Sequence, residues 1–471
     1  MKIVDLEIKG ITSNSKEIKK GFLFVAIKGE RQNGNHFIQE AIARGAVIVV
    51  VEKKAPQIKS RAKVVFLVVN DCRKFFAQVT HKFYGAPSNK VKVVGITGTN
   101  GKTTIAYLIE RMAKESGYDC GVIGTINYRF KGRIIIAKNT TPGAAELQGL
   151  LRKMYLGKVK YCAMEVSSHA LAQERAAGIN FSHAVFTNLT QDHLDYHKNL
   201  KNYFLAKAKL FSALPATSTA IINNDDQHGN RIKRLTKAKI LTYGIKRKSD
   251  IMAKEINFNL QSTEFLLVAP HIYVRMKTSL VGCYNIYNIL AAVAWGLSEK
   301  LPVQDIKRAI EKFKNVPGRL EKINCSKVGS IFVDYAHTPD ALFNVISALR
   351  PLIKGKIVVI FGCGGERDKL KRPQMGKVVT ELADYAIITS DNPRSENPGQ
   401  IIKDIQQGIQ KTNYCSISDR RQAIRKGLSL INQADCLLVA GKGHEDYQIL
   451  KNRALKFNDR KVVRECLRLM K

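Results

Sequence analysis

Short apolar runs alternate with longer amphipathic stretches along most of the chain. The apolar runs predict buried strands, and the amphipathic stretches between them predict helices. The strands expected in the middle of the chain are 91–96, 161–166, 183–188 and 219–223, and those expected toward its end are 330–335, 356–361, 385–390 and 436–440. Strands that alternate with helices form parallel sheets covered on both faces, so the predicted fold class is α/β.

Two parts of the chain depart from this alternation. The beginning carries shorter strands with a single helix and then a cluster of turn residues that reads as a linker; the strands are 21–27, 46–51 and 64–69, the helix is 35–44 and the linker is 84–89. Residues 251–276 have the pattern of an antiparallel insertion, and helices at 284–299 and 303–313 precede a break at Pro317. We therefore expect three domains, over 1–88, 89–316 and 317–471.

The composition is that of a soluble globular protein with an unusual charge. The 471 residues include 77 Lys and Arg against 39 Asp and Glu, which gives a formal net charge of +38. The basic residues are spread out and lack interleaved aromatic residues to stack bases, so we expect no specific nucleic-acid partner. No apolar run approaches the ~18 residues of a membrane span. Nine cysteines without a Cys-x-x-Cys pair are typical of a reduced cytoplasmic protein.

A loop rich in glycine and threonine follows the strand expected at 91–96 and opens a helix expected at 103–115. This placement suits a phosphate-binding loop, because backbone N–H groups and the helix N-terminus attract an anion. Lys102 can reach the β- and γ-phosphates of a nucleotide, and Thr103 can offer its hydroxyl to Mg²⁺. Ile96 stands where the usual motif has its first glycine, and a chance turn is the alternative. We expect ATP to contact Gly98, Thr99, Asn100, Gly101, Lys102, Thr103 and Thr104.

Several further motifs occur in a fixed order, most of them where predicted strands end, which is where ligands collect in open α/β sheets. They are Asn-Thr-Thr-Pro at 139–142, Glu-Val-Ser-Ser-His at 165–169, Asn-Leu-Thr-Gln-Asp-His-Leu-Asp at 188–195, Pro-Gly-Arg-Leu-Glu at 317–321, Asp-Tyr-Ala-His-Thr-Pro-Asp at 334–340, Asp-Asn-Pro-Arg at 391–394 and Gly-Lys-Gly-His-Glu at 441–445. With the loop Gly-Thr-Asn-Gly-Lys-Thr-Thr at 98–104, this series resembles the Mur ligase superfamily, and within it the MurE-type enzymes. The resemblance runs from Ile11 to Gln448.

The resemblance implies an activity. MurE-type enzymes are ATP-dependent ligases that add meso-2,6-diaminopimelate to UDP-N-acetylmuramoyl-L-alanyl-D-glutamate through an acyl phosphate, in cytoplasmic peptidoglycan precursor synthesis. It implies a UDP-sugar-binding N-terminal domain, a central ATPase domain of the P-loop type and a Rossmann-like C-terminal domain that binds the amino acid. The cofactors would be ATP and Mg²⁺, and the C-terminal domain would close on the central one. We expect a monomer.

The resemblance also gives roles to residues that would otherwise be ordinary. Alone, Glu165 reads as a cap of the next turn, His193 as a loop residue and Lys207 as part of a solvated helix face. The resemblance assigns magnesium to Thr103, Glu165 and His193, with a carbamylated Lys207 acting as an extra carboxylate. It places Asn285, Asn288, Arg319 and Asp334 against ATP, and the residues expected in catalysis are Lys102, Lys207, Arg319 and His337.

The two remaining substrates would lie on either side of the ATP site. The resemblance assigns the UDP-sugar dipeptide to Ser15, Glu30, Arg31, Gln32, Asn139, Thr140, Thr141, Ser167, Gln173 and Arg175. It assigns diaminopimelate to Arg367, Asp391, Asn392, Pro393, Arg394, Gly441 and Glu445. Arginines and acids that converge at one sheet edge suit an amino acid, because guanidinium binds carboxylate and carboxylate binds ammonium. Diaminopimelate users of the family carry Asp-Asn-Pro-Arg here, whereas lysine users lack that arginine.

Two rival functions fit parts of the sequence. Folylpolyglutamate synthetase belongs to the same superfamily and shares the acyl-phosphate chemistry, but the domain before the phosphate loop and Arg394 argue against it. A P-loop NTPase stimulated by nucleic acid would suit the charge of +38. That class needs a helicase-like second motif or an aromatic and basic surface, and neither is visible.

Overall fold

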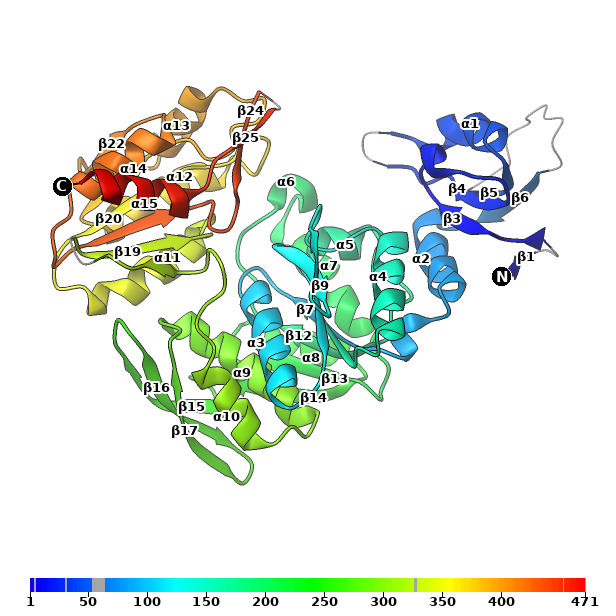
Figure 1. Ribbon diagram of the computed structural model, residues 1–471, viewed down its shortest axis with the longest axis horizontal. Helices are drawn as coiled ribbons and strands as arrows, with labels where there is room; N and C mark the ends of the chain where they lie inside the picture. The colour runs from blue at the N-terminus through cyan, green and yellow to red at the C-terminus, as the bar shows by residue number, and fades with distance from the viewer. Residues whose placement is uncertain (4–5, 30–31, 53–63, 326–327, 452, 471) are drawn as a thin grey trace.

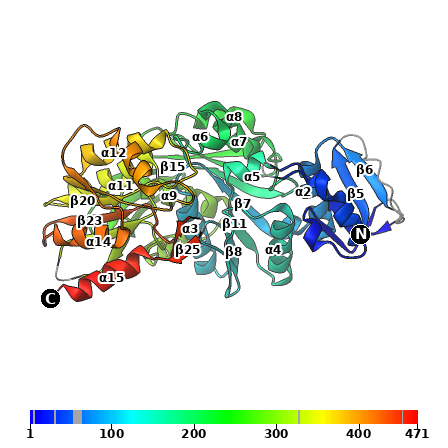
Figure 2. The ribbon, with the colours of Figure 1, turned by 90° about the horizontal axis from the view of Figure 1, so that it is seen from above.

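The computed structural model describes residues 1–3, 6–29, 32–52, 64–325, 328–451 and 453–470. It has three α/β domains, each built around its own sheet (Figure 1). Figures 1 and 2 both show the central domain between the N-terminal and the C-terminal domain. The α/β class and the three-domain architecture predicted from the sequence are confirmed; the boundaries at 88 and 316 stay predictions.

The N-terminal domain has a parallel sheet in the order β3-β4-β5-β6. Its strands are β3 (Gly10–Thr12), β4 (Phe22–Val25), β5 (Ala46–Glu52) and β6 (Val65–Val69), after the short pair β1 (Lys2–Ile3) and β2 (Leu6–Glu7). Helix α1 (Ile38–Ala43) lies within the predicted helix, extended by the 3₁₀ turn Gly34–Phe37. The sequence analysis missed α2 (Cys72–Phe83), which the side chain of Asp71 caps and which buries Phe76 and Val79.

The central sheet runs in the order β10-β9-β8-β11-β7-β12-β13-β14-β15-β16-β17. Strand β7 (Lys92–Thr97) lies between the parallel strands β11 (Tyr161–Glu165) and β12 (Phe181–Phe186). The apolar runs predicted these strands and their parallel sheet but not their order. The other strands are β8 (Cys120–Ile123), β9 (Asn127–Phe130), β10 (Arg133–Ile136), β13 (Thr219–Asn223), β14 (Lys239–Gly244), β15 (Ile251–Phe258), β16 (Thr263–Ala269) and β17 (Ile272–Thr278). Strands β15–β17 are antiparallel to one another as expected, but they are no separate insertion, because β15 pairs with β14 and extends the central sheet.

Helices cover both faces of the central sheet, since the buried strands have apolar side chains on both sides. One hydrophobic core packs α3 (Lys102–Glu115), α9 (Cys283–Ser298) and α10 (Val303–Glu311) against the sheet. The other core packs α4 (Ala144–Leu156), α7 (Leu200–Ser212) and α8 (Gly229–Leu235) against it. The short helices α5 (Ser168–Ala172) and α6 (Leu194–His197) follow β11 and β12 at the carboxyl edge of the sheet.

The C-terminal sheet runs in the order β18-β19-β23-β20-β21-β22. The strands are β18 (Glu321–Ile323), β19 (Ser330–Asp334), β20 (Ile357–Phe361), β21 (Tyr385–Ile388), β22 (Tyr414–Ser416) and β23 (Cys436–Ala440). The helices are α11 (Pro339–Leu349), α12 (Lys371–Leu382), α13 (Pro398–Gln406), α14 (Arg420–Ser429) and α15 (Asp459–Leu469). A hairpin of β24 (Tyr447–Leu450) and β25 (Arg453–Lys456), which the sequence analysis did not predict, follows β23.

The carboxyl ends of the central and C-terminal sheets face one another. Asn100 of the phosphate loop donates to the Asp340 carboxylate at the start of α11 (Nδ2–Oδ2 2.7 Å), and Thr190 approaches the same oxygen. Among the helices that the structure describes, none combines the length and the apolar character needed to cross a bilayer.

Candidate active site

The phosphate loop connects β7 to α3 and forms the floor of a cavity of about 840 Å³ between the two larger domains. Gly98 and Gly101 both have positive φ, at 148° and 91°. A Cβ atom at Gly98 would collide with the Thr187 hydroxyl, and one at Gly101 with the Asn288 side chain. The backbone of this loop therefore needs glycine at both positions, which leaves its N–H groups accessible to an anion.

Lys102 opens α3 and bends back over the loop. Its Nζ donates to the carbonyl oxygens of Gly98 (2.9 Å) and Thr99 (2.7 Å). Burial lowers the pKa of Lys102 below its usual value, although Glu165 and Asp192 favour the charged form. The ammonium group thus lies on the loop that would hold the phosphates.

Glu165 ends β11 and is buried, with its carboxylate held by threonines. Oε2 accepts from the hydroxyls of Thr103 (3.1 Å) and Thr125 (3.0 Å), and Oε1 accepts from the Thr125 backbone N–H (2.9 Å). Thr103 and Glu165 both line the cavity. They offer a hydroxyl and a carboxylate oxygen at the N-terminus of α3, which are the hard ligands that Mg²⁺ prefers.

His193 lies in the turn after β12, with the backbone in the left-handed region (φ 56°). Its Nε2 is 3.4 Å from the Asp192 carboxylate, and its ring lies edge-on to that of His169. Burial lowers the pKa of His193 to about 3, so its imidazole is neutral and one ring nitrogen can act as an acceptor or a metal ligand. Asp192 also faces Lys371 of α12 (3.6 Å), which is a second contact between the two domains.

Lys207 is buried on α7 and lines the cavity. Its Nζ donates to the Gly98 carbonyl (2.8 Å) and lies 4.3 Å from the centroid of the Tyr203 ring. Burial and the nearby Lys102 ammonium lower the pKa of Lys207 well below its usual value. Lys209, two residues on, is instead half exposed and pairs with Glu174. Of these two lysines, Lys207 is therefore the one whose uncharged form burial favours.

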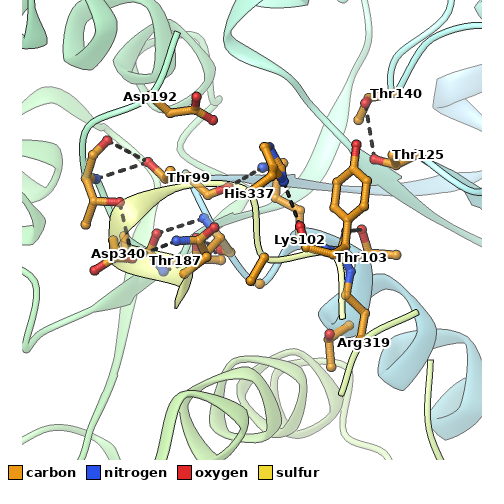
Figure 3. Close-up of a pocket in the computed structure, with 18 of the residues that line it drawn as sticks. Thr99, Lys102, Thr103, Thr125, Thr140, Thr187, Asp192, Arg319, His337 and Asp340 are labelled. Carbon is orange, nitrogen blue, oxygen red and sulfur yellow. Dashed lines mark hydrogen bonds between the residues drawn. The ribbon is translucent and has the colours of Figure 1, made fainter. Parts of the chain in front are cut away.

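Three groups of the C-terminal domain line the same cavity, and one of them contacts the loop. Arg319 donates from Nη2 to the Thr103 hydroxyl (3.2 Å), and Figure 3 shows its guanidinium beside that threonine. Asp334 ends β19 and accepts from the backbone N–H groups of Leu320 and Ala336; burial raises its pKa. His337 contacts the Tyr335 carbonyl through Nδ1 (2.7 Å), and burial lowers the pKa of its ring to about 4.

On the opposite side of the loop, α9 presents two asparagines. Asn285 donates to the Val281 carbonyl (2.8 Å), and Asn288 donates to Asn285 (3.1 Å). Both are buried and both line the cavity, beside Tyr284.

The loops after β20, β21 and β23 form the C-terminal wall of the cavity. Arg394 has positive φ (55°), and its Nη1 donates to the carbonyls of Gly365 and Asn392. Glu445 accepts from Asn392 (2.8 Å) and from Lys442 (2.9 Å) on the same oxygen, Oε2. Burial and the nearby Asp391 raise the pKa of Glu445. Guanidinium and carboxylate groups thus line one space, and its role as an amino-acid site stays a prediction.

Comparisons with known proteins agree with this geometry. Three family models match successive parts of the chain. The model described as "Mur ligase family, catalytic domain" matches residues 7–84, and "Mur ligase middle domain" matches residues 96–296. The model described as "Mur ligase, glutamate ligase domain" matches residues 318–443. A UDP-N-acetylmuramoyl-L-alanyl-D-glutamate–2,6-diaminopimelate ligase of Aquifex aeolicus is 43% identical over 461 residues, which cover 98% of this chain and 94% of the relative. The ligase of the same name from Clostridium botulinum is 41% identical over 464 residues, 98% and 95% of the two chains.

The chain belongs to the Mur ligase family. A solved structure of a UDP-N-acetylmuramoyl-L-alanyl-D-glutamate–2,6-diaminopimelate ligase has a TM-score of 0.71 at 31% identity and covers 98% of this chain and 95% of its own. The MurF ligase of Thermotoga maritima, solved with ADP, has a TM-score of 0.63 at 20% identity, with 99% and 98% covered, and shows the shared fold. The family predicted from the motifs is confirmed.

As a Mur ligase, the chain brings most of its predicted site residues to one cavity. From the predicted sets, the lining includes the loop Thr99–Thr104, Glu165, His193, Lys207, Asn285, Asn288, Arg319, Asp334, His337, Asn139, Thr140, Ser167, Arg367, Asp391, Asn392, Arg394, Gly441 and Glu445. Their roles remain predictions. The structure adds Asp192, Asp340 and Lys371 to the lining. Asp192 and Asp340 lie within the quoted motifs without an assigned role, and nothing in the sequence around Lys371 distinguishes it from a surface charge.

The other predicted residues lie outside the lining. Thr141 donates to the Glu165 carbonyl (2.8 Å), and Arg175 donates to the Thr141 carbonyl. Gln173 contacts the Tyr196 hydroxyl. These side chains therefore contact other residues of the central domain next to the cavity. Gly98 and Pro393 affect the backbone conformation of their loops, with Gly98 at a positive φ and the ring of Pro393 restricting φ. In the N-terminal domain, Ser15 is buried and donates to Glu40 (2.8 Å). Gln32 belongs to the same domain, and Glu30 and Arg31 lie outside the described residues.

Proposed function

We propose that this Mur ligase is an ATP-dependent ligase that joins meso-2,6-diaminopimelate to UDP-N-acetylmuramoyl-L-alanyl-D-glutamate in cytoplasmic peptidoglycan precursor synthesis. The observation that carries the proposal is that one cavity contains the phosphate loop, the buried Lys207 and the arginine and carboxylate groups around Arg394. The two relatives described above, which align with 98% of this chain, are both named UDP-N-acetylmuramoyl-L-alanyl-D-glutamate–2,6-diaminopimelate ligase.

ATP would bind with its phosphates on the loop 98–104 and its base toward Asn285 and Asn288. The N-terminus of α3 and the Lys102 ammonium favour the phosphate charge. Arg319 closes over the loop from the C-terminal domain and adds a second cation beside the γ-phosphate.

Magnesium fits the oxygen ligands at the start of α3. In the described part of the chain, no group of three or more His, Cys, Asp or Glu side chains is close enough together to hold a metal ion. Mg²⁺ does not need one, because it usually takes one or two protein oxygens together with phosphates and water. Thr103, Glu165 and the neutral His193 would hold it, with a carbamylated Lys207 as a further carboxylate. When bound, the metal neutralises charge on the transferred phosphoryl group.

The peptidyl carboxylate would enter between Asn139, Thr140 and Ser167, whose neutral donors line the wall of the central domain. Phosphorylation of this carboxylate by ATP gives an acyl phosphate, and the diaminopimelate amine attacks its carbonyl carbon. The C–N bond forms as the C–O bond to phosphate breaks, and the products are an amide, ADP and phosphate. The residues of the chain contribute orientation and charge stabilisation.

Diaminopimelate would bind the C-terminal wall. Arg394 and Arg367 face its carboxylates, and Glu445 with Asp391 faces an ammonium group. Domain closure would bring this wall to the acyl phosphate. Asp340 with Asn100 and Lys371 with Asp192 are contacts between the two domains beside the cavity. We propose that the chain does this as a monomer.

A coupled assay tests the proposal. Phosphate release should need ATP, UDP-N-acetylmuramoyl-L-alanyl-D-glutamate and meso-diaminopimelate together, and the mass of the product should equal the sum of dipeptide and amino acid less water. Turnover with a folate and glutamate, or stimulation by RNA with no amino acid present, would instead support one of the rival functions.

A further inference from the structure

Lys442 is a fully buried lysine whose function none of the preceding observations explains. It lies in the Gly-Lys-Gly-His-Glu loop after β23, with no exposed surface. Its Nζ donates to Oε2 of Glu445 (2.9 Å) and to Oδ1 of Asn392 (3.0 Å). A buried ammonium is costly unless it is paired, and these two contacts provide the partners that the Lys442 ammonium needs.

Asn392 forms hydrogen bonds with both Lys442 and Glu445. Its Nδ2 donates to Oε2 of Glu445 (2.8 Å), while its Oδ1 accepts from Lys442 and from the Ile449 backbone N–H (3.0 Å). Among the described residues, the hydrogen bonds to the Glu445 carboxylate therefore all fall on Oε2. Glu445 and Asn392 line the cavity whereas Lys442 does not, so Oε1 is the oxygen left for a ligand.

The charges around Glu445 show why a cation is needed behind it. Asp391 is a second carboxylate nearby, and it acts with burial to raise the pKa of Glu445. Arg420 also faces these acids, but its guanidinium is bound to Asp459 by Nε (2.8 Å) and Nη2 (2.7 Å). Tyr335 and Tyr447 also face Glu445, and burial together with this carboxylate raises the pKa of both phenols. Lys442 is thus the cation in direct contact with Glu445.

We infer that Lys442 is a positioning residue for the amino-acid site: it keeps Glu445 ionised, occupies Oε2 and turns Oε1 toward an ammonium group of the incoming amino acid. Lys442 does not itself touch the substrate. The inference rests on the proposed function insofar as that amino acid is diaminopimelate. Without Lys442, Glu445 would lie buried beside the Asp391 carboxylate with no cation in contact, which favours the protonated form of Glu445, and a protonated carboxyl binds ammonium poorly.

Steady-state kinetics of three variants test this role. In Lys442→Met, KM for diaminopimelate near neutral pH should rise about tenfold or more, the factor that one unit of pKa represents. The rise should shrink as pH increases, because Glu445 then ionises without help. KM for ATP should change little, Lys442→Arg should restore most of the affinity, and Glu445→Gln should weaken diaminopimelate binding at every pH. A rise that is equal for all three substrates, or that is independent of pH, would overturn the inference.

A second measurement needs no substrate. Thermal unfolding of Lys442→Met, Glu445→Gln and the double variant forms a cycle. The double variant should melt above Lys442→Met alone, because neutral glutamine does not need the cation. Additive losses would overturn the coupling between the two residues. If the wild-type protein turned over no diaminopimelate, the proposed function would fail, while this cycle would still decide whether Lys442 sustains the Glu445 charge.

Discussion

Arg319 of the C-terminal domain donates a hydrogen bond to Thr103 of the phosphate loop (Nη2–Oγ1 3.2 Å), although the two residues are 216 positions apart in the chain. The guanidinium is oriented from behind by the Tyr335 ring, whose centroid is 4.4 Å from Cζ. The C-terminal domain thus places a cation at the N-terminus of α3, where phosphate charge would develop during transfer.

Replacing Arg319 with lysine should slow catalysis more than it weakens binding. Lysine keeps the charge but loses the planar fork that can contact Thr103 and a phosphoryl oxygen together. We expect kcat to fall about 100-fold, the usual effect of removing one preorganised donor, with KM for the dipeptide little changed. The exposed Arg308 on α10 offers a matched control, because Arg308→Lys should leave kcat unaltered. A rise in KM for ATP with kcat intact would mean that Arg319 only binds the nucleotide.

Lys207 should be carbamylated, because carbamylation needs an uncharged amine and burial lowers the pKa of Lys207 well below its usual value. Lys207→Ala should be inactive and should regain part of its activity with formate or acetate, since a small carboxylate can enter the vacated space. Assays with and without each salt measure the rescue. Lys209→Ala, two residues along the same helix, should retain activity. Full activity of Lys207→Ala, or a high-resolution map with a bare amine at Lys207, would contradict this prediction.

The local parts of the site could be predicted from the sequence, and the contacts between domains could not. The strand, loop and helix around Gly98 and Lys102 depend on residues adjacent in the chain, so periodicity and glycine spacing indicate them. The pairs Asn100–Asp340 and Asp192–Lys371 join segments of two different domains that are far apart in the sequence, so no local pattern indicates them. Helix α2 differs from these pairs, because the Asp71 cap and the buried Phe76 form a local capped, amphipathic pattern that is visible in the sequence.

The buried pair of Arg420 and Asp459 should matter for stability rather than for chemistry. Both side chains have no exposed surface, and two hydrogen bonds join them. Arg420→Met would leave the Asp459 carboxylate buried without a cation, which should lower the free energy of unfolding by about 3–5 kcal/mol. The adjacent Arg421 is half exposed and pairs with Glu465, so Arg421→Met should cost at most about 1 kcal/mol. Chemical denaturation of both variants measures the difference, and equal losses would show that burial is not the cause.

Arg394 should determine which amino acid the enzyme accepts. Its backbone is fixed after Pro393 by hydrogen bonds with Ile449 and Lys451, and among the described residues its guanidinium donates from Nη1 alone, to two carbonyls. The remaining guanidinium donors are therefore available to a substrate in the cavity that Arg394 lines. Diaminopimelate differs from lysine by a carboxylate on its distal carbon, and a buried carboxylate needs a partner.

Replacing Arg394 with alanine should weaken the use of diaminopimelate by about 2–5 kcal/mol, the usual cost of breaking a buried charge pair. Lysine lacks the distal carboxylate and should lose little activity or even gain some. The measurement is kcat/KM for both amino acids in the wild type, in Arg394→Ala and in Arg453→Ala, whose exposed arginine lies on the neighbouring hairpin. Arg453→Ala should behave like the wild type. If the wild type prefers lysine, or if Arg394→Ala lowers kcat/KM equally for both amino acids, Arg394 does not bind the distal carboxylate of diaminopimelate.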